Sequence, residues 1–252
     1  MSAEKPRRLW GSSSELADLL EAMPGGMDIA VRDFALITLA GQLSTSFPRQ
    51  LVFKGGFVLR HVHGILRFSK DVDTTRHDPP QHKLEGEEVA EAIRQASIRN
   101  IVRFSPDKPA TDSARSLDFD NVQVIGETFP NSSVQVEVSY REAVVDDPVE
   151  AYIGEPFYEE FGLLTMTVEE MAAEKIRALA QRLRPTDLAD LAVMLARSTT
   201  SDADIARLAL VKFELVAKGQ ANRNVRIERQ LRDMADTGRR GAGVVPWGSA
   251  VP

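Results

Sequence analysis

The chain has 252 residues, enough for one large domain or two small ones, and 43% of them are hydrophobic, enough for a substantial core. Its formal net charge of −6 argues against a protein that coats nucleic acid indiscriminately, and the absence of cysteine excludes a disulfide framework and a thiolate metal site. The N-terminus has no apolar run of signal-peptide length, and no stretch approaches the length of a membrane span. We therefore expect a cytoplasmic protein with no membrane contact.

Apolar periodicity predicts two helices near the N-terminus, over residues 13–22 and 27–45. Further elements are expected in this order: a strand at 51–54, a short helix that ends at Gly64, a strand at 70–76, a helix at 85–102, and strands at 116–127 and 133–140. This order is not a repeated strand–helix–strand pattern. It predicts an α/β fold with a mixed sheet and flanking helices.

The character of the sequence changes after residue 164. Thr167 and Glu170 form a capping-box pattern at the start of a helical stretch, and three more helical stretches follow. The expected divisions are an N-terminal extension at 1–24, an α/β domain at 25–160, a C-terminal helical domain at 161–240 and a disordered tail at 241–252.

Two acidic residues alternate on the strand predicted at 70–76. Residues two apart project to the same face of a strand, so Asp71 and Asp73 repel each other unless a cation lies between them. Mg²⁺, or Mn²⁺, takes such carboxylates together with water and phosphate oxygens. Glu137 is the candidate third ligand, because it lies on the opposite face of its strand from the valines. The pattern predicts a divalent-metal site.

A double glycine precedes this strand. Without a β-carbon, the backbone N–H groups of Gly55 and Gly56 can approach a nucleoside triphosphate closely. An ordinary turn is the alternative for the glycines, and a solvated strand face is the alternative for the acids. Asp118 and Asp120 have the same spacing without an upstream double glycine, and we interpret both as surface residues.

The stretch FKGGFVLRHVHGILRFSKDVD, residues 53–73, resembles the double-glycine to D-x-D signature of the nucleotidyltransferase superfamily. It is most similar to the AbiEii/AbiGii toxin family, and the resemblance runs from about residue 28 to 195 through VRDFALITLA, VQVEVSY and AEKIRALAQRLRPTDLADL. Phe57 departs from the family's usual Ser or Thr and removes a hydroxyl, and Glu137 stands for the more frequent Asp. The resemblance implies a nucleotidyltransferase-type sheet followed by a helical region.

The resemblance also implies a second group of site residues. Lys175 and Asp190 would be catalytic, while Arg182, Asp187 and Ser69 would contribute to nucleotide binding. The alternative is a solvated lysine and arginine on an amphipathic helix, with acids that complement a helix dipole. We expect a partly exposed Lys175 to contribute little to stability.

By resemblance, the protein is a metal-dependent nucleotidyltransferase toxin with a separately encoded antitoxin. It would transfer nucleotides from an NTP to RNA, at the 3′ end of tRNA, and so block translation. The basic segment at 218–240 is compatible with RNA binding or with an ordinary charged helix. Two alternatives stay open: transfer to a protein, including the chain itself at Ser69, and a non-catalytic nucleotide- or partner-binding module. His61 and His63 are expected at the surface of the short helix.

Overall fold

The computed structural model describes residues 5–65, 67–77, 84–113, 116–140, 144–182, 184–198 and 200–216. The chain divides into two compact units, Met1–Thr167 and Val168–Pro252. Beyond the described residues lie the basic segment at 218–240, with its expected helix, and the expected tail at 241–252.

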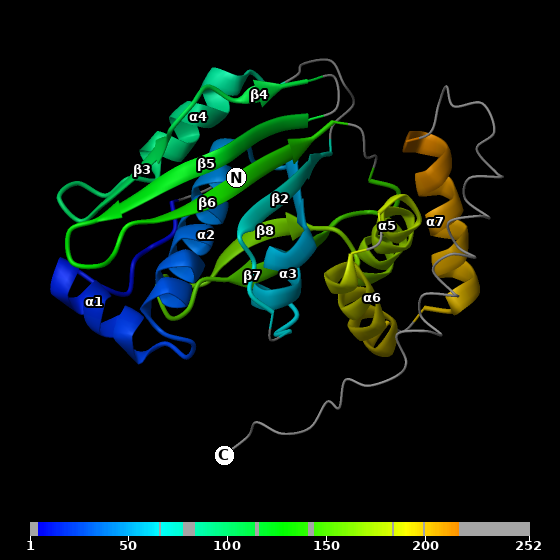
Figure 1. Ribbon diagram of the computed structural model, residues 1–252, viewed down its shortest axis with the longest axis horizontal. Coiled ribbons are helices and arrows are strands. Elements are labelled where there is room, and N and C mark those ends of the chain that lie inside the picture. The colour runs from blue at the N-terminus through cyan, green and yellow to red at the C-terminus, as the bar shows by residue number, and fades with distance from the viewer. Residues whose placement is uncertain are drawn as a thin grey trace. The chain divides into compact units, whose positions relative to one another are not determined.

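The first unit is built on one mixed sheet with the strand order β3-β5-β6-β2-β1-β8-β7, and β4 pairs with β5 at its side (Figure 1). The pairs β1–β8 and β2–β6 are parallel and the others are antiparallel. The strands are β1 Leu51–Lys54, β2 Asp71–Arg76, β3 Val102–Pro106, β4 Thr111–Asp112, β5 Ser116–Gly126, β6 Ser132–Ser139, β7 Val149–Ile153 and β8 Phe161–Thr165. The predicted α/β class and mixed sheet are confirmed.

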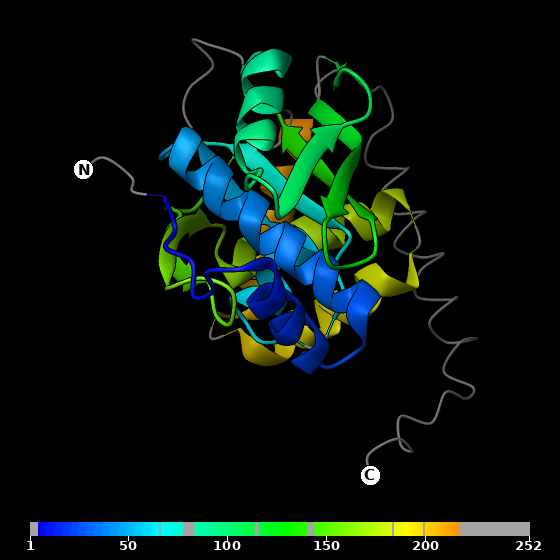
Figure 2. The same ribbon diagram turned by 90° about the vertical axis from the view of Figure 1, so that its left-hand side faces the viewer.

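Four helices accompany the sheet within the described part of this unit. They are α1 Ser13–Ala22, α2 Met27–Ser46, α3 Gly55–His61 and α4 Gly86–Gln95. Nearly every residue of α2 after its first turn is buried, because the helix packs on the sheet and on α1 and α4 (Figure 2). On β6 the valines are buried while Gln135 between them is exposed, so α2 covers the apolar face and leaves the polar face of β6 open.

Local sequence explains where these helices begin. Ser12 caps α1, since its hydroxyl accepts a hydrogen bond from the Glu15 backbone N–H at 3.2 Å. Glu85 and Glu88 form a reciprocal capping box at the start of α4. The predicted helix at 85–102 is too long, because α4 ends at Gln95 and Asn100 adopts a left-handed backbone with φ 59°. This turn allows Val102 to begin β3, a strand that the periodicity did not predict.

The described part of the second unit is helical, as expected. Its helices are α5 Val168–Gln181, α6 Pro185–Arg197 and α7 Asp202–Val216. Ala173, Leu208 and Ala209 form a small core between α5 and α7. Glu170, which the sequence places in a capping box, pairs with the fully buried ammonium of Lys212. This ion pair links α5 to α7. Both charges are buried, so each is stable only while it is paired with the other.

Candidate active site

Acidic residues from three strands form one row across the polar face of the sheet. Asp73 of β2 lies opposite Glu137 of β6 in parallel register, and Glu137 lies opposite Asp118 of β5 in antiparallel register. Opposed residues project to the same face of a sheet, and Asp71 shares that face because it lies two residues before Asp73. The register thus places the three predicted metal ligands on one face and adds Asp118 to them.

The interpretation of Asp118 as a surface residue is wrong. Its side chain is half-buried, and the Ser116 hydroxyl donates a hydrogen bond to its Oδ2 at 2.7 Å. Asp120 is exposed, as expected, and it lies where the β5–β6 register shifts between Phe119 and Val122. Of the two acids, only Asp118 therefore neighbours Glu137.

Gly55 and Gly56 lie against the same acidic strand, at the junction of β1 and α3. Gly55 has a left-handed backbone with φ +72°, and a β-carbon there would collide with the Asp73 carboxylate. A β-carbon at Gly56 would lie 2.7 Å from Ser69 Oγ and 2.9 Å from Arg67 Nη1. The close packing of Asp73, Ser69 and Arg67 therefore depends on both glycines.

Ser69 is oriented by the first acid of the pair. Its buried hydroxyl donates to Asp71 Oδ1 at 2.7 Å, and its Oγ also lies 3.3 Å from the Asp71 carbonyl oxygen. A carboxylate that accepts a hydroxyl proton can raise the nucleophilicity of that oxygen. The predicted role of Ser69 in nucleotide binding stays a prediction, but the side chain belongs to the cluster around Asp71 and Gly56.

The donor set on this face is the kind that Mg²⁺ or Mn²⁺ prefers. Asp71, Asp73 and Glu137 offer hard carboxylate oxygens, and the strand register brings their backbones together. Among the described residues, no three Asp, Glu or His side chains are already gathered into a metal-binding cluster. The residues thus fit a divalent cation in kind and in backbone placement.

A buried ion pair between α2 and α3 contacts the segment that leads into β2. Asp33 of α2 is buried, and its carboxylate accepts a bifurcated hydrogen bond from Arg60 Nε, at 3.0 Å to Oδ1 and 2.9 Å to Oδ2, and another from Arg60 Nη2. Arg60 Nη1 lies 3.4 Å from the Arg67 carbonyl oxygen, and the guanidinium lies 4.8 Å from the centre of the Phe68 ring. The pair therefore holds the residues just before Ser69.

The short helix α3 faces the core more than the sequence indicates. Phe57 is fully buried against Phe53 and His61, so this departure from the family pattern serves packing. The expectation that His61 and His63 are surface residues is wrong, since both are at least half-buried. Burial, followed by the Arg60 charge, lowers the pKa of His61 to about 4, which keeps the imidazole neutral.

The second unit gathers the other predicted site residues around one lysine. Lys175 Nζ on α5 lies 2.7 Å from Asp187 Oδ1 and 3.0 Å from Asp190 Oδ2, both on α6. Arg182 Nε lies 3.2 Å from Asp187 Oδ2. The side chains of Lys175, Asp187 and Asp190 are 16%, 3% and 5% exposed, while that of Arg182 is 51% exposed. The lysine is thus not a solvated charge on an amphipathic face.

Neighbouring cations favour the ionised form of Asp187 in this cluster. Burial raises the pKa of the Asp187 carboxyl, but the hydrogen bond and charge of Lys175, together with Arg182, outweigh burial and bring the pKa below its ordinary value. Two buried carboxylates beside one ammonium depend on that ammonium for their stability. The expectation that Lys175 contributes little to stability stays untested, but its contacts with two buried carboxylates favour a larger contribution.

Sequence reasoning missed two residues of this sheet face: Asp118, which extends the acidic row, and Lys54, which lies beside Asp73. Lys54 is buried and lies opposite Asp73 in the β1–β2 register, so a cation neighbours the metal-site candidate. The signal for Lys54 was its place directly before the double glycine, and the signal for Asp118 was the strand alternation that it shares with Glu137. Neither signal identifies a neighbour until the strand order is known.

None of the helices in the described part of the chain is long and apolar enough to cross a bilayer. No curated protein matches the chain. Among solved structures, the chain is similar to JHP933 from Helicobacter pylori, with a TM-score of 0.51 and 15% identity over 84% of this chain and 93% of that one. It is also similar to MenT4, the nucleotidyltransferase toxin Rv2826c from Mycobacterium tuberculosis H37Rv, with a TM-score of 0.49 and 18% identity over 90% and 98%. At such identities the likeness to JHP933 concerns the fold.

The family comparison is more specific, because it concerns the sequence itself. The family described as nucleotidyl transferase AbiEii toxin, type IV toxin–antitoxin system, matches residues 38–241. The match includes the double glycine, the acidic row and the Lys175 cluster. The chain therefore belongs to the AbiEii family of nucleotidyltransferase toxins.

Proposed function

We propose that the protein transfers a nucleotide from an NTP to the 3′ end of an RNA, with tRNA as the acceptor, and that this modification blocks translation. The observation that carries the proposal is the alignment of Asp71, Asp73 and Glu137 on one sheet face, directly beside the tightly packed Gly55 and Gly56. Membership of a type IV toxin–antitoxin family implies an NTP substrate and a separate antitoxin.

In this proposal, the acceptor hydroxyl attacks the α-phosphate in line, a new phosphodiester bond forms and pyrophosphate leaves. The backbone of Gly55 and Gly56 receives the triphosphate, because no side chain blocks its approach. Asp71, Asp73 and Glu137 would hold one or two Mg²⁺ or Mn²⁺ ions. A bound divalent ion supplies positive charge that stabilises the attacking and leaving oxygens.

The Lys175 cluster has a different role in the proposal. Its ammonium contributes a positive charge to the nucleotide phosphates, as the family resemblance implies. Asp187 and Asp190 hold the ammonium in one position, and Arg182 adds a second, exposed cation. Lys175 and Asp190 are therefore proposed as catalytic, with Asp187 and Arg182 as their partners in nucleotide binding.

The exposed ring of Phe68 supports a nucleotide or RNA substrate. The side chain is 52% exposed although it lies next to buried Ser69, and Arg60 backs the ring. Bases stack on aromatic rings with little regard to sequence, at roughly 1–3 kcal/mol per base. A ring held in place by a guanidinium loses little freedom when a base stacks on it.

Ser69 favours a second candidate function, transfer to a protein hydroxyl in place of RNA. Its Oγ donates to Asp71 Oδ1 at 2.7 Å, so the carboxylate is placed to accept the proton as the oxygen attacks the α-phosphate. The chain would then carry a nucleotidyl group on Ser69, and pyrophosphate would leave. This self-modification uses the same acidic row as transfer to RNA.

One incubation separates these functions. The protein is mixed with each α-labelled NTP, total tRNA and Mg²⁺, and the label is followed into RNA and into protein. We expect label in tRNA, its loss when EDTA is added, and arrest of a cell-free translation reaction that receives the treated tRNA. Label in the protein that disappears in Ser69→Ala would establish the second function, and label in neither would refute both.

A further inference from the structure

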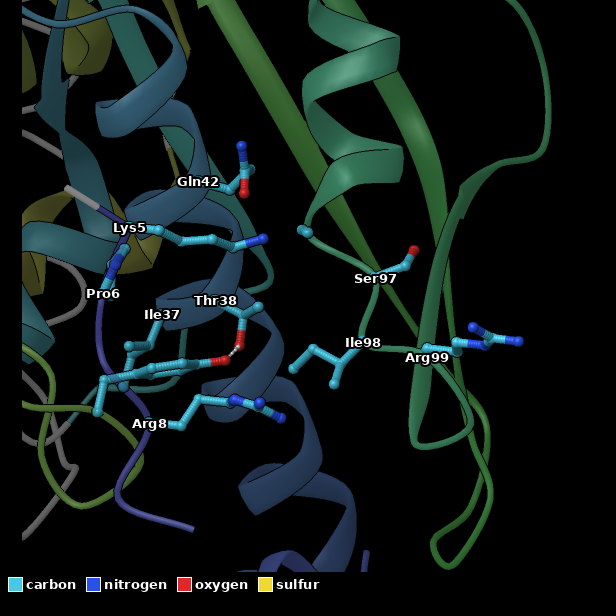
Figure 3. A pocket seen from close by; sticks show the side chains of 11 residues that line it. Lys5, Pro6, Arg8, Ile37, Thr38, Gln42, Ser97, Ile98 and Arg99 are labelled. Atoms are coloured by element: carbon cyan, nitrogen blue, oxygen red, sulfur yellow. Dashed lines mark hydrogen bonds between the residues drawn. The ribbon is translucent and has the colours of Figure 1, made fainter. Parts of the chain in front are cut away.

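A cavity of about 310 Å³ lies in the first unit, on the side of the sheet that α2 covers. Its walls come from the N-terminal segment, from α2 and from the connection between α4 and β3 (Figure 3). The acidic row lies on the other face of the sheet, because α2 packs against the valine face of β6. The cavity is therefore separate from the candidate active site.

Three cationic residues line this cavity. Only Lys5 and Arg8 direct their charged groups toward it: both are exposed, whereas the side chain of Arg99, which also lines the cavity, points away from them (Figure 3), and none of the lining residues is Asp or Glu. The Lys5 ammonium donates to the carbonyl oxygen of Gln95 at 3.0 Å. Burial and then the charge of Arg8 lower the pKa of Lys5, which indicates that the cations repel one another. An anion bound among them would relieve this repulsion.

The floor of the cavity presents hydrogen-bond acceptors. Thr38 donates its hydroxyl proton to the Phe34 carbonyl oxygen at 2.7 Å, so the 2.9 Å contact between Thr38 and Tyr158 uses the tyrosine proton. Burial raises the pKa of Tyr158 to about 12, so the phenol keeps that proton, and the lone pairs of its oxygen remain to accept.

Gln42 adds a second acceptor and is the least satisfied group of the floor. It is 7% exposed, and its Nε2 donates to Ser46 Oγ at 3.0 Å. Its Oε1 is buried and has no hydrogen-bond partner within the described structure. A buried acceptor without a donor is costly, so a ligand that supplies an N–H or O–H group here gains more than it would at an exposed site. Figure 3 shows this carboxamide at one end of the cavity, beyond Thr38 on the same helix.

We propose that this cavity binds a nucleoside phosphate, with the phosphate between Lys5 and Arg8 and the base turned toward Gln42 and Tyr158. Ile37 and Ile98 supply apolar walls for a flat ring, and the floor acceptors match the amino and imino groups that nucleobases carry. The volume lies at the lower end of the range for ligand pockets, about 300–1,000 Å³, which suits one nucleotide better than a length of RNA. The site is thus a second nucleotide site, distinct from the NTP site of the transfer reaction.

Calorimetric titration of the full chain with AMP or GMP in EDTA tests the assignment. The chelator removes divalent cations, and a monophosphate lacks the phosphates that the transfer site requires. We expect one saturable site that binds a nucleoside monophosphate more tightly than inorganic phosphate. Arg8→Glu should weaken that binding by about tenfold or more, because a charge-assisted contact becomes a repulsion. Arg103→Glu is the matched control, since Arg103 is exposed on β3 and does not line the cavity.

A second variant tests the floor. Gln42→Leu should weaken binding of the nucleotide but leave binding of inorganic phosphate unchanged, and melting of each unliganded variant checks that it folds. The proposal is overturned if neither monophosphate binds, if Arg8→Glu binds as wild type does, or if Gly56→Ala abolishes binding and so places it in the transfer site. A single-stranded oligoribonucleotide that binds tenfold more tightly than the monophosphate would also overturn it and assign the surface to RNA.

Discussion

Asp73 and Glu137 lie opposite each other on two neighbouring parallel strands, although residues paired in the β2–β6 register are 64 positions apart in the sequence. Two carboxylates on one sheet face repel each other unless a cation is near, and Lys54 neighbours Asp73 on its other side. The row continues to Asp118. The acidic row therefore makes this face of the sheet attractive to cations.

Loss of Asp73 should abolish nucleotide transfer. Asp73→Asn keeps the shape of the side chain but removes its charge, and we expect transfer to fall by at least about a hundredfold, as it should in Asp71→Asn. Asp120→Asn is the control, because Asp120 is an exposed acid of the same sheet. Initial rates with labelled NTP and tRNA measure the effect, and an Asp120→Asn variant as inactive as Asp73→Asn would contradict the assignment.

The third carboxylate can be identified by comparing two neighbours. Glu137→Gln should weaken the binding of Mg²⁺ and so raise the Mg²⁺ concentration that gives the half-maximal rate by about tenfold or more. Asp118→Asn should shift this concentration less, since one of the Asp118 carboxylate oxygens already accepts a hydrogen bond from the Ser116 hydroxyl. The measurement is a Mg²⁺ titration of the rate for each variant. A larger shift in Asp118→Asn than in Glu137→Gln would move the third ligand from β6 to β5.

Gly56 should tolerate no side chain. Gly56→Ala places a β-carbon 2.7 Å from Ser69 Oγ and 2.9 Å from Arg67 Nη1, so one or both groups must move. We expect the KM for NTP to rise by about tenfold or more, because the phosphate approach and the Ser69–Asp71 contact are disturbed together. In the control Gly11→Ala, the nearest heavy atom to the new β-carbon is Glu15 Oε2 at 3.5 Å, an ordinary contact. Unchanged NTP kinetics in Gly56→Ala would remove the glycine from the site.

Lys175 should matter both for transfer and for stability. In Lys175→Met, the carboxylates of Asp187 and Asp190 stay buried without their ammonium, and breaking such a pair costs roughly 3–5 kcal/mol. We expect a value near the lower end, because Arg182 still pairs with Asp187. Urea denaturation measures the free energy of unfolding.

Arg182→Ala provides the comparison for that experiment. Its side chain is half-exposed, so its loss should cost no more than about 1 kcal/mol. Lys175→Arg should recover part of the stability but not the full rate of transfer, since a planar guanidinium meets phosphate differently from a point charge. A Lys175→Met variant as stable as wild type would show that the two acids are protonated or solvated in the folded protein.

Acid should destabilise the first unit through His61. The pKa of this histidine is about 4 in the folded protein and 6.5 in the unfolded chain, so below pH 6.5 the unfolded chain binds a proton that the folded chain does not. Stability attributable to His61 is thus lost as pH falls from 6.5 to 4, by about 3 kcal/mol in total. Unfolding of wild type and His61→Leu across this range measures the slope, which should be shallower in the variant. His77→Leu, at an exposed position, should keep the wild-type slope.

Local signals predicted much of the fold. The helices α1 and α2 and the strands β1, β2, β5 and β6 have long or regular apolar patterns, and the structure has them at the expected places. The strands β3, β7 and β8 have five residues each and were not predicted. β1 is as short, but the double glycine directly after it marks its end, and no such signal bounds the other three. β8 is ordered by parallel pairing with β1, a contact between distant parts of the sequence.

The amino-acid sequence alone supplied the chemical groups of the candidate site. Residue spacing indicated the alternating acids and the double glycine, since neighbours two apart on a strand share a face, whereas Lys175, Asp187 and Asp190 were expected only from the family resemblance. The strand order, which no local pattern contains, makes Glu137 the neighbour of Asp73, extends the acidic row to Asp118 and places Lys54 beside it. The packing of α5 against α6 likewise makes Lys175 a partly buried partner of two buried carboxylates, because burial depends on contacts between helices.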